Sequence, residues 1–316
     1  MNAFKGSTAV KQQLVEPIRG PWNSRELLPF GMLKFRDKYN LTSLSGALAQ
    51  TEDKKEFEER TGIPLELALL CEAMISMGTQ LYVTEEAPTV PIQVGSDDVL
   101  SFGTQWLDAV TPGVDLSDVV PKYMVELFET MLDREFVMAK YIEPEVREAA
   151  VRILQLWKRE LSGEDVGNAE WKEARKCAIA ASEGIKQAKC LPAARVVEAL
   201  AWPVRSVSSD FVSVFQGFGM SWMTELQYPF FLEEDRRNQD LIDEGWLLFV
   251  RIDQGTYEKT IEEVMAERAD IKKAFDSQMD PVIRERKRNA RIKASIVTDP
   301  VVRGQMAKLL DLIVAA

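Results

Sequence analysis

Three acidic residues toward the C-terminal end of the chain have the types and spacing that could bind a metal ion. Glu263 and Glu267 are four positions apart, and Asp270 follows three positions later, so a helix through them would place their carboxylates on one face. Convergent carboxylate oxygens are suitable ligands for Mg²⁺. The spacing therefore predicts one alternative function, a magnesium-dependent all-α nucleotide hydrolase. Lysine and arginine residues on the same segment equally favour an ion-paired, solvated helix.

Other catalytic chemistry has little support, because the sequence contains no histidine. Histidine is the usual general base near neutral pH and the commonest metal ligand, so serine and cysteine triads that depend on it are excluded. Cys71, Cys177 and Cys190 have no CxxC spacing and lie in apolar or alanine-rich stretches. We expect them to be reduced thiols rather than disulfides or zinc ligands. No cofactor is expected, and binding is favoured over catalysis.

Two glycines, Gly217 and Gly219, are spaced as in a phosphate-binding loop. A dinucleotide fingerprint needs a third glycine and a strand before the loop, and neither is present. The pair is therefore expected to break a helix beside buried aromatic residues.

The chain is acidic, with 50 Asp and Glu residues against 39 Lys and Arg residues and a net charge of -11. Such a field repels nucleic acid and favours basic partners. The leading prediction is a non-enzymatic protein-interaction protein that binds a basic protein partner. The alternative for each candidate contact is a solvated helix face. The candidate contacts are Glu233, Glu234, Asp235, Asp240, Asp243 and Glu244.

A basic cluster follows these acids and could neutralise phosphates. No aromatic residue is interleaved with it, which disfavours stacking on single-stranded nucleic acid. Pairing with the acidic surface, within the chain or between subunits, is favoured at least as much. Pairing between subunits would fit a second alternative, a homo-oligomeric helical subunit of a virion or another assembly. The cluster consists of Arg284, Arg286, Lys287, Arg288, Arg291 and Lys293.

These residues must be positioned by helices, because helical periodicity dominates the sequence. The clearest example is an apolar helix face that begins at Val146. It has apolar residues at offsets of three, four, seven and eight from Val146 and continues past Trp157. We expect an all-α fold, either a multi-helix bundle or an irregular helical array. The least helical region is near 80–95, where residues 81–84 and 89–94 could form two short strands or an extended loop.

Proline and capping residues suggest the organisation of the chain. We expect an irregular N-terminal arm over 1–23, a small helical module over 24–79 that begins with a helix over 24–39, a linker with one helix over 80–115, and a main helical domain over 116–316. Late helices are expected to start at Thr256, at Asp280-Pro281 and at Thr298-Asp299-Pro300.

Segments of this main domain follow one another as an acidic helix, an arginine-bearing helix ending near a tryptophan, and an alanine-rich helix. They are VELFE (125–129), EPEVREAA (143–150), WKRE (157–160) and EARKCAIAA (173–181). This order resembles that of the helical putative immunity proteins of bacterial toxin systems, over about residues 120–205. The resemblance implies stoichiometric inhibition of a toxin rather than catalysis, and it identifies no individual binding residue.

The sequence contains no apolar run of about 18 residues, the length that a membrane-spanning helix needs. Its N-terminus also lacks the apolar core of a secretory signal. We therefore expect no membrane association and a cytoplasmic location, or a virion-associated one if the source is viral.

Overall fold

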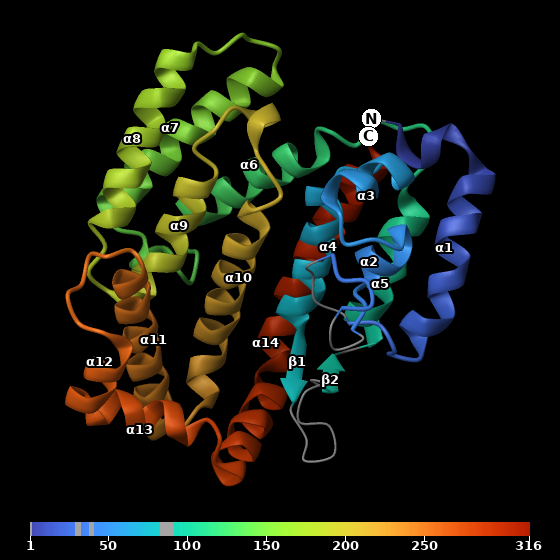
Figure 1. Cartoon of the computed structure of the whole chain (residues 1–316). Coiled ribbons are helices and arrows are strands. Elements are labelled where there is room, and N and C mark those ends of the chain that lie inside the picture. Colours follow the sequence, from blue (N-terminus) through green and yellow to red (C-terminus); the bar gives the residue numbers. More distant parts are fainter. Residues whose placement is uncertain (1, 29–32, 38–40, 83–91, 96) are drawn as a thin grey trace.

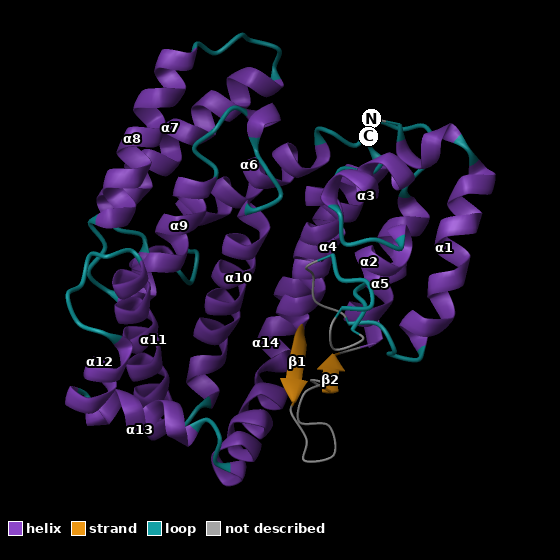
Figure 2. Cartoon of the chain, in the orientation of Figure 1, coloured by secondary structure: helices purple, strands orange, loops and turns teal. Residues whose placement is uncertain are grey.

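The computed structural model describes residues 2–28, 33–37, 41–82, 92–95 and 97–316, and these ranges are built almost entirely of helices (Figure 1 and Figure 2). The all-α prediction is confirmed. The α-helices of the described residues are α1 (Thr8–Asn23), α2 (Leu44–Ala49), α3 (Lys54–Thr61), α4 (Leu65–Gly78), α5 (Asp97–Ala109), α6 (Val119–Leu132), α7 (Pro144–Leu161), α8 (Asn168–Glu183), α9 (Leu191–Ala199), α10 (Phe211–Gln227), α11 (Glu233–Asp253), α12 (Ile261–Glu267), α13 (Ala269–Ser277) and α14 (Pro281–Val314). Short 3-10 turns connect some of them, namely η1 (Ala3–Gly6), η2 (Ala139–Tyr141), η3 (Ala188–Cys190), η4 (Val204–Ser206) and η5 (Tyr228–Phe230).

The expected two-strand excursion is present. Strand β1 (Thr79–Tyr82) pairs antiparallel with β2 (Ile92–Gly95), and Thr79 lies opposite Gly95. The predicted strand positions 83, 84 and 89–91 lie outside the described residues. The hairpin is a small addition to a helical fold, at one end of α4 (Figure 2).

Helix α4 lies at the centre of the core. It is apolar around its whole circumference, which is typical of a helix that neighbours cover on all sides. Helices α10 and α14 pack along it (Figure 1). Gly219 permits the close approach of α10, because a Cβ atom there would lie 2.4 Å from Met77 Sδ. One continuous core takes buried residues from 3–223 and 302–313, and so it crosses the boundaries expected at 23, 79 and 115.

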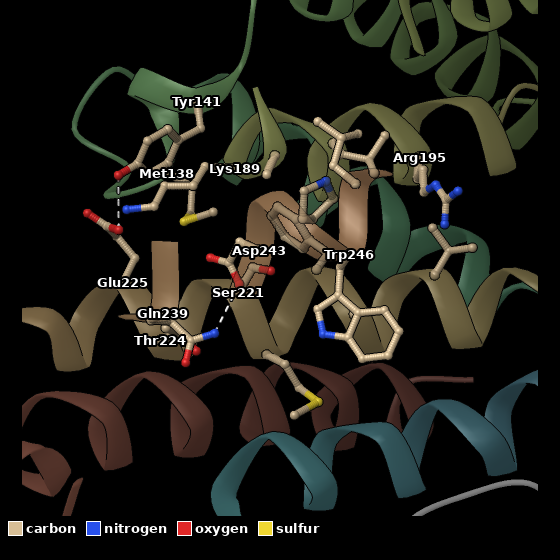
Figure 3. Close-up of a pocket in the computed structure, with 18 of the residues that line it drawn as sticks. Met138, Tyr141, Lys189, Arg195, Ser221, Thr224, Glu225, Gln239, Asp243 and Trp246 are labelled. Atoms are coloured by element: carbon tan, nitrogen blue, oxygen red, sulfur yellow. Dashed lines mark hydrogen bonds between the residues drawn. The ribbon is translucent and has the colours of Figure 1, made fainter. Parts of the chain in front are cut away.

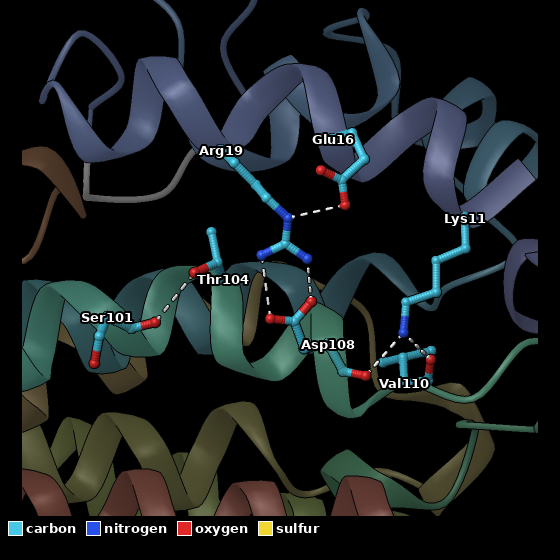
Figure 4. A network of polar contacts seen from close by, with 7 residues as sticks. All are labelled: Lys11, Glu16, Arg19, Ser101, Thr104, Asp108 and Val110. Carbon is cyan, nitrogen blue, oxygen red and sulfur yellow. Dashed lines mark hydrogen bonds and ion pairs between the residues drawn. The ribbon is translucent and has the colours of Figure 1, made fainter.

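The expectation of an irregular N-terminal arm was wrong, because residues 8–23 form α1 in spite of Pro17 and Pro21. A proline inside a helix removes a backbone hydrogen bond at a cost of about 3 kcal/mol. Burial of one apolar face of α1, which includes Trp22, offsets that cost. Polar contacts to α5 and to the residue after it also stabilise α1 (Figure 4). The Arg19 guanidinium forms a two-pronged ion pair with Asp108, and Lys11 Nζ donates to the carbonyl oxygen of Val110 at 2.7 Å.

The helix expected over 24–39 is also absent from the described residues of that range, 24–28 and 33–37. Positive φ angles at Arg25, Leu33 and Arg36 are incompatible with a right-handed helix. The backbone instead bonds to the segment before α2, where Leu28 N donates to Thr42 O at 2.8 Å and Ser43 N donates to Lys34 O at 2.8 Å. Residues 29–32 and 38–40 of this prediction lie outside the described residues.

Three expected helix boundaries were wrong as well. Helix α10 runs unbroken through Gly217 and Gly219, and α14 runs unbroken through Pro300. In α14 the cost of the proline is offset by the C-terminal half of the helix, which is inserted in the core and receives a hydrogen bond from Tyr123 Oη to Gln305 Oε1 at 2.8 Å. Helix α12 begins after a capping box at Thr260 rather than at Thr256. The start expected at Asp280-Pro281 is confirmed.

Helices α11–α13 pack beside this core rather than in it, since none of their buried residues in the described chain belongs to the main cluster. They contact one another through a partly exposed aromatic cluster, in which the rings of Trp246, Phe249 and Phe275 lie with centroids 5.6 Å apart. A seam therefore separates α11 from α9 and α10, and seams between packed units are common places for ligand cavities.

Within the described residues, no single helix is both long and apolar enough to cross a membrane. Helices α3 and α4 satisfy length and composition only as a pair, and they are bent by 100° relative to each other. The residues of α4 are buried among other helices of the chain.

Candidate functional site

Four of the six acids expected to meet a partner lie in ion pairs within the chain. Asp235 is only 1% exposed and accepts two bonds from Arg286, at 2.8 Å from Nε and 2.5 Å from Nη2. Glu234 lies 3.6 Å from the same guanidinium. Asp240 pairs with Lys189 at 2.8 Å, and Glu244 pairs with Arg268 at 2.7 Å. The remaining two acids are Glu233, which is exposed, and Asp243, which lines a cavity.

The six basic residues expected to form a nucleic-acid patch do not share one exposed face of α14. Arg286 points to Asp235, and Lys287 is buried, which lowers the pKa of its ammonium group. Arg288 lies 3.4 Å from Glu285, and Arg291 is half-buried. Arg284 and Lys293 are exposed. The intramolecular pairing of basic and acidic helices that the sequence left open is thus realised in the Arg286–Asp235 pair.

The predicted magnesium ligands are not brought together. The helix expected to carry them is broken at Arg268, whose φ and ψ are -103° and 70°. Glu263 completes the capping box of α12, Glu267 forms an ion pair with Lys259, and Asp270 lies 2.9 Å from Arg268. The Arg268 guanidinium lowers the pKa of Asp270 to about 2. Among the described residues no cluster of acids and cysteines could hold a metal ion.

The three cysteines are free thiols. Burial raises the pKa of the Cys71 thiol well above its usual value, and burial raises that of Cys190 to about 11. Neither is a thiolate at neutral pH, so neither is an activated nucleophile.

A cavity lies in the seam between α10 and α11, with α9, η2 and η3 at its ends (Figure 3). Its volume is about 480 Å³. The cavity exists because α10 turns its small side chains toward it at helical spacing, from Ser213 through Gly217 and Ser221 to Thr224. A Cβ atom at Gly217 would meet nothing within 4 Å. The two glycines that suggested a phosphate loop therefore have separate packing roles, one toward Met77 and one toward this cavity.

One end of the cavity is a rigid cluster of aromatic rings and charges. Lys189 Nζ lies 4.3 Å from the ring centroid of Tyr228 and 5.5 Å from that of Tyr141. Tyr141 Oη donates to Glu225 at 3.1 Å, and Tyr228 Oη donates to Asp240 at 2.9 Å. Burial, followed by the charges of Asp243 and Asp240, raises the pKa of Tyr228. The charges at this end are therefore already matched by partners within the chain.

The middle of the cavity is different, because Asp243 has no cationic partner in direct contact among the described residues. Its Oδ1 accepts a hydrogen bond from the neutral amide of Gln239 at 3.0 Å, and the residue is half-buried (Figure 3). Burial raises the pKa of Asp243, and the charges of Lys189 and Lys287 lower it in part. A desolvated carboxylate beside an open volume is a favourable place for a cation from a ligand.

Two apolar side chains at the mouth are exposed to an unusual degree. Trp246 is 57% exposed and Met220 is 52% exposed, and both line the cavity. Exposed tryptophan and methionine are typical of binding surfaces. The arrangement can bind an elongated side chain with an apolar stem and a cationic end.

Sequence reasoning found Asp243 in this site and missed Trp246, Met220 and Lys189. The available signal was the run of small residues in α10, which leaves space on one helix face. That signal becomes specific only when the facing helix is known.

In comparisons with known proteins, no family model, no curated protein and no solved structure matches this chain. The resemblance of residues 120–205 to immunity proteins therefore stays a prediction.

Proposed function

We propose that this chain is a non-enzymatic interaction protein that holds a basic, amphipathic side chain of a protein partner in the α10–α11 cavity. The observation that carries the proposal is the pairing of a half-buried carboxylate, Asp243, with an exposed indole, Trp246, in one cavity. The indole would cover the aliphatic stem of a lysine or arginine, and the carboxylate would meet its charged end.

The energetics favour a cationic ligand. The free-energy cost of burying Asp243 is already met when the chain folds. A cation that enters the cavity therefore gains a charge-assisted contact in a partly desolvated site. The net charge of -11 would in addition raise the rate at which a basic partner arrives. The segment that resembles the immunity proteins supplies one wall, including Tyr141 and Lys189. A basic toxin would therefore be a partner of the proposed kind.

The test is the loss of binding in Asp243→Asn. The probes are fluorescein-labelled amphipathic peptides rich in lysine or arginine, and the same peptides with norleucine at the basic positions. Charge-assisted contacts contribute about 1.5–3 kcal/mol, so we expect Asp243→Asn to weaken binding of the basic peptides by roughly tenfold to a hundredfold. Fluorescence anisotropy at two salt concentrations measures the change.

Glu233→Gln is the matched control, because it removes one negative charge from an exposed position on the same helix, outside the cavity. It should change the affinity less than twofold, about the scale of a screened surface charge. Equal effects of the two substitutions, or equal binding of the norleucine peptides, would show that the cavity is not the site.

A second candidate function, a self-assembling subunit, is favoured by exposed apolar residues along one side of α14. Val282, Ile292 and Ile296 are each about half to three-quarters exposed. If this side joins copies of the chain, the wild type should be oligomeric in light scattering, and Val282→Asp with Ile296→Asp should yield monomers. Val151→Asp on α7, also at an exposed apolar residue, should leave the oligomer intact. A wild type that is monomeric at every concentration rules this function out.

A further inference from the structure

A second cavity, which shares the lining residue Val214 with the one above, has unpaired cations rather than an unpaired carboxylate. It lies between α8, the segment that leads from α9 to α10, and the start of α10, and its volume is about 710 Å³. Cavities of about 300–1,000 Å³ hold most small-molecule ligands. Its walls combine two indoles, Trp171 and Trp202, with two cations, Lys172 and Arg175.

The two cations have no carboxylate partner among the described residues. Lys172 and Arg175 are three positions apart on α8 and therefore lie on one face. The Arg175 guanidinium stacks on Trp202, with Cζ 3.5 Å from the ring centroid. Arg159 on α7, by contrast, pairs with Glu164 and Glu170. Lys172 and Arg175 therefore give this cavity two cations that no carboxylate in direct contact neutralises.

The two indoles are held in place by hydrogen bonds to α7, and Trp171 is only 4% exposed. Glu160 Oε1 accepts from Trp171 Nε1 and its Oε2 accepts from Val204 N, each at 2.7 Å. Trp157 Nε1 donates to the carbonyl oxygen of Trp202 at 3.0 Å. Both indoles are therefore tied to α7. Trp202 itself remains 38% exposed. A wall fixed before binding loses little entropy when a ligand enters.

The one acid that lines the cavity does not oppose an anionic ligand strongly. Asp210 is paired with Lys54, with Nζ and Oδ1 2.5 Å apart. The hydroxyls of Ser206 and Ser208 also line the cavity and can donate hydrogen bonds to an anion.

We propose that this cavity binds an aromatic phosphate of the size of a nucleoside monophosphate. The planar ring packs against the exposed part of Trp202, and the phosphate lies against Lys172 and Arg175. Aromatic stacking supplies contact area, and the paired cations supply charge-assisted bonds to phosphate oxygens. The inference concerns binding only, and it is independent of the interaction proposed for the α10–α11 cavity.

Titration calorimetry of the full chain tests the proposal, with intrinsic tryptophan fluorescence as a second readout. The ligands are AMP, GMP, CMP and UMP, with the four nucleosides and inorganic phosphate as comparisons. We expect at least one monophosphate to bind, its nucleoside and phosphate alone to bind at least about tenfold more weakly, and binding to quench fluorescence. Lys172→Gln and Arg175→Gln should each weaken the binding by about tenfold or more.

Lys176→Gln is the matched control, because Lys176 is an exposed cation on α8 that does not line the cavity. It should bind like the wild type. Arg175→Lys keeps the charge but loses the planar stack, and it should fall between wild type and Arg175→Gln. Circular dichroism confirms that each variant is folded. The proposal is overturned if no monophosphate binds, if inorganic phosphate binds as well as the monophosphates, or if the three neutralising substitutions have equal effects.

Discussion

Replacing Arg286 by methionine is expected to destabilise the protein by about 3–5 kcal/mol, the usual cost of leaving a buried charge without its partner. Asp235 is 1% exposed, and Arg286 is the only cation among the described residues that bonds to its carboxylate. The pair ties α11 to α14, which are 51 positions apart at these residues. Urea unfolding at pH 7, followed by circular dichroism, measures the change in the free energy of unfolding.

The two halves of this pair should not be equivalent. The Arg286 side chain is 32% exposed, so water can solvate it when Asp235 is replaced by asparagine, and this loss should be nearer 1–2 kcal/mol. The double variant should recover part of the loss in Arg286→Met, because it leaves no isolated charge. Glu234→Gln removes the exposed member of the same cluster and should cost less than about 0.5 kcal/mol. Equal costs for Arg286→Met and Glu234→Gln would contradict the assignment.

A capping residue followed by proline predicted one helix start correctly and one wrongly. Helix α14 begins at Pro281 after the Asp280 cap, because proline fits the first turn without losing a bond, but no helix starts at Asp299-Pro300. The sequence predicted helix ends poorly where a proline or glycine stands inside an apolar stripe. Pro17 and Pro300 remain within helices since burial of the surrounding face outweighs the missing hydrogen bond. That balance depends on tertiary packing, which local patterns do not contain.

The candidate site was predictable only in part, for a similar reason. The acidic segment of α11 was recognised, but which acids are free depends on cations remote in the sequence. Asp240 and Glu244 are matched by Lys189 and Arg268, whereas Asp243 is not matched by a direct partner in the described chain. Charge composition predicts an acidic surface, and only the fold decides which carboxylate faces an open cavity.

Glu72 is the second residue whose charge should have a large effect on the stability of the folded chain. It lies on α4, is fully buried, and accepts a hydrogen bond from Ser45 N at 2.6 Å through Oε1. Its Oε2 atom is buried with no hydrogen-bond partner. Burial raises the pKa of Glu72 from 4.5 to about 7, although bonds from Ser45 and Ser43 lower it in part. The folded chain therefore holds a proton on Glu72 that the unfolded chain releases above pH 4.5.

The pH dependence follows from that difference. Below pH 4.5 the carboxyl is protonated in both states, and Glu72 costs no stability. Between pH 4.5 and about 7 the folded state binds more protons than the unfolded state, so stability falls as the pH rises. Above pH 7 the full cost is present, and the shift in pKa corresponds to roughly 3 kcal/mol.

Glu72→Gln keeps an acceptor for Ser45 N and removes the charge. We expect its free energy of unfolding to exceed that of the wild type by about 2–3 kcal/mol at pH 8 and to equal it near pH 4.5, because only the ionised carboxylate is penalised by burial. Denaturant unfolding at both pH values measures the difference. Glu59→Gln, at an exposed position on α3, should change stability by less than about 0.5 kcal/mol at either pH. A Glu72→Gln variant that is no more stable than the wild type at pH 8 would mean that Glu72 is ionised in the folded chain at no cost, through a cation or water molecules that reach Oε2.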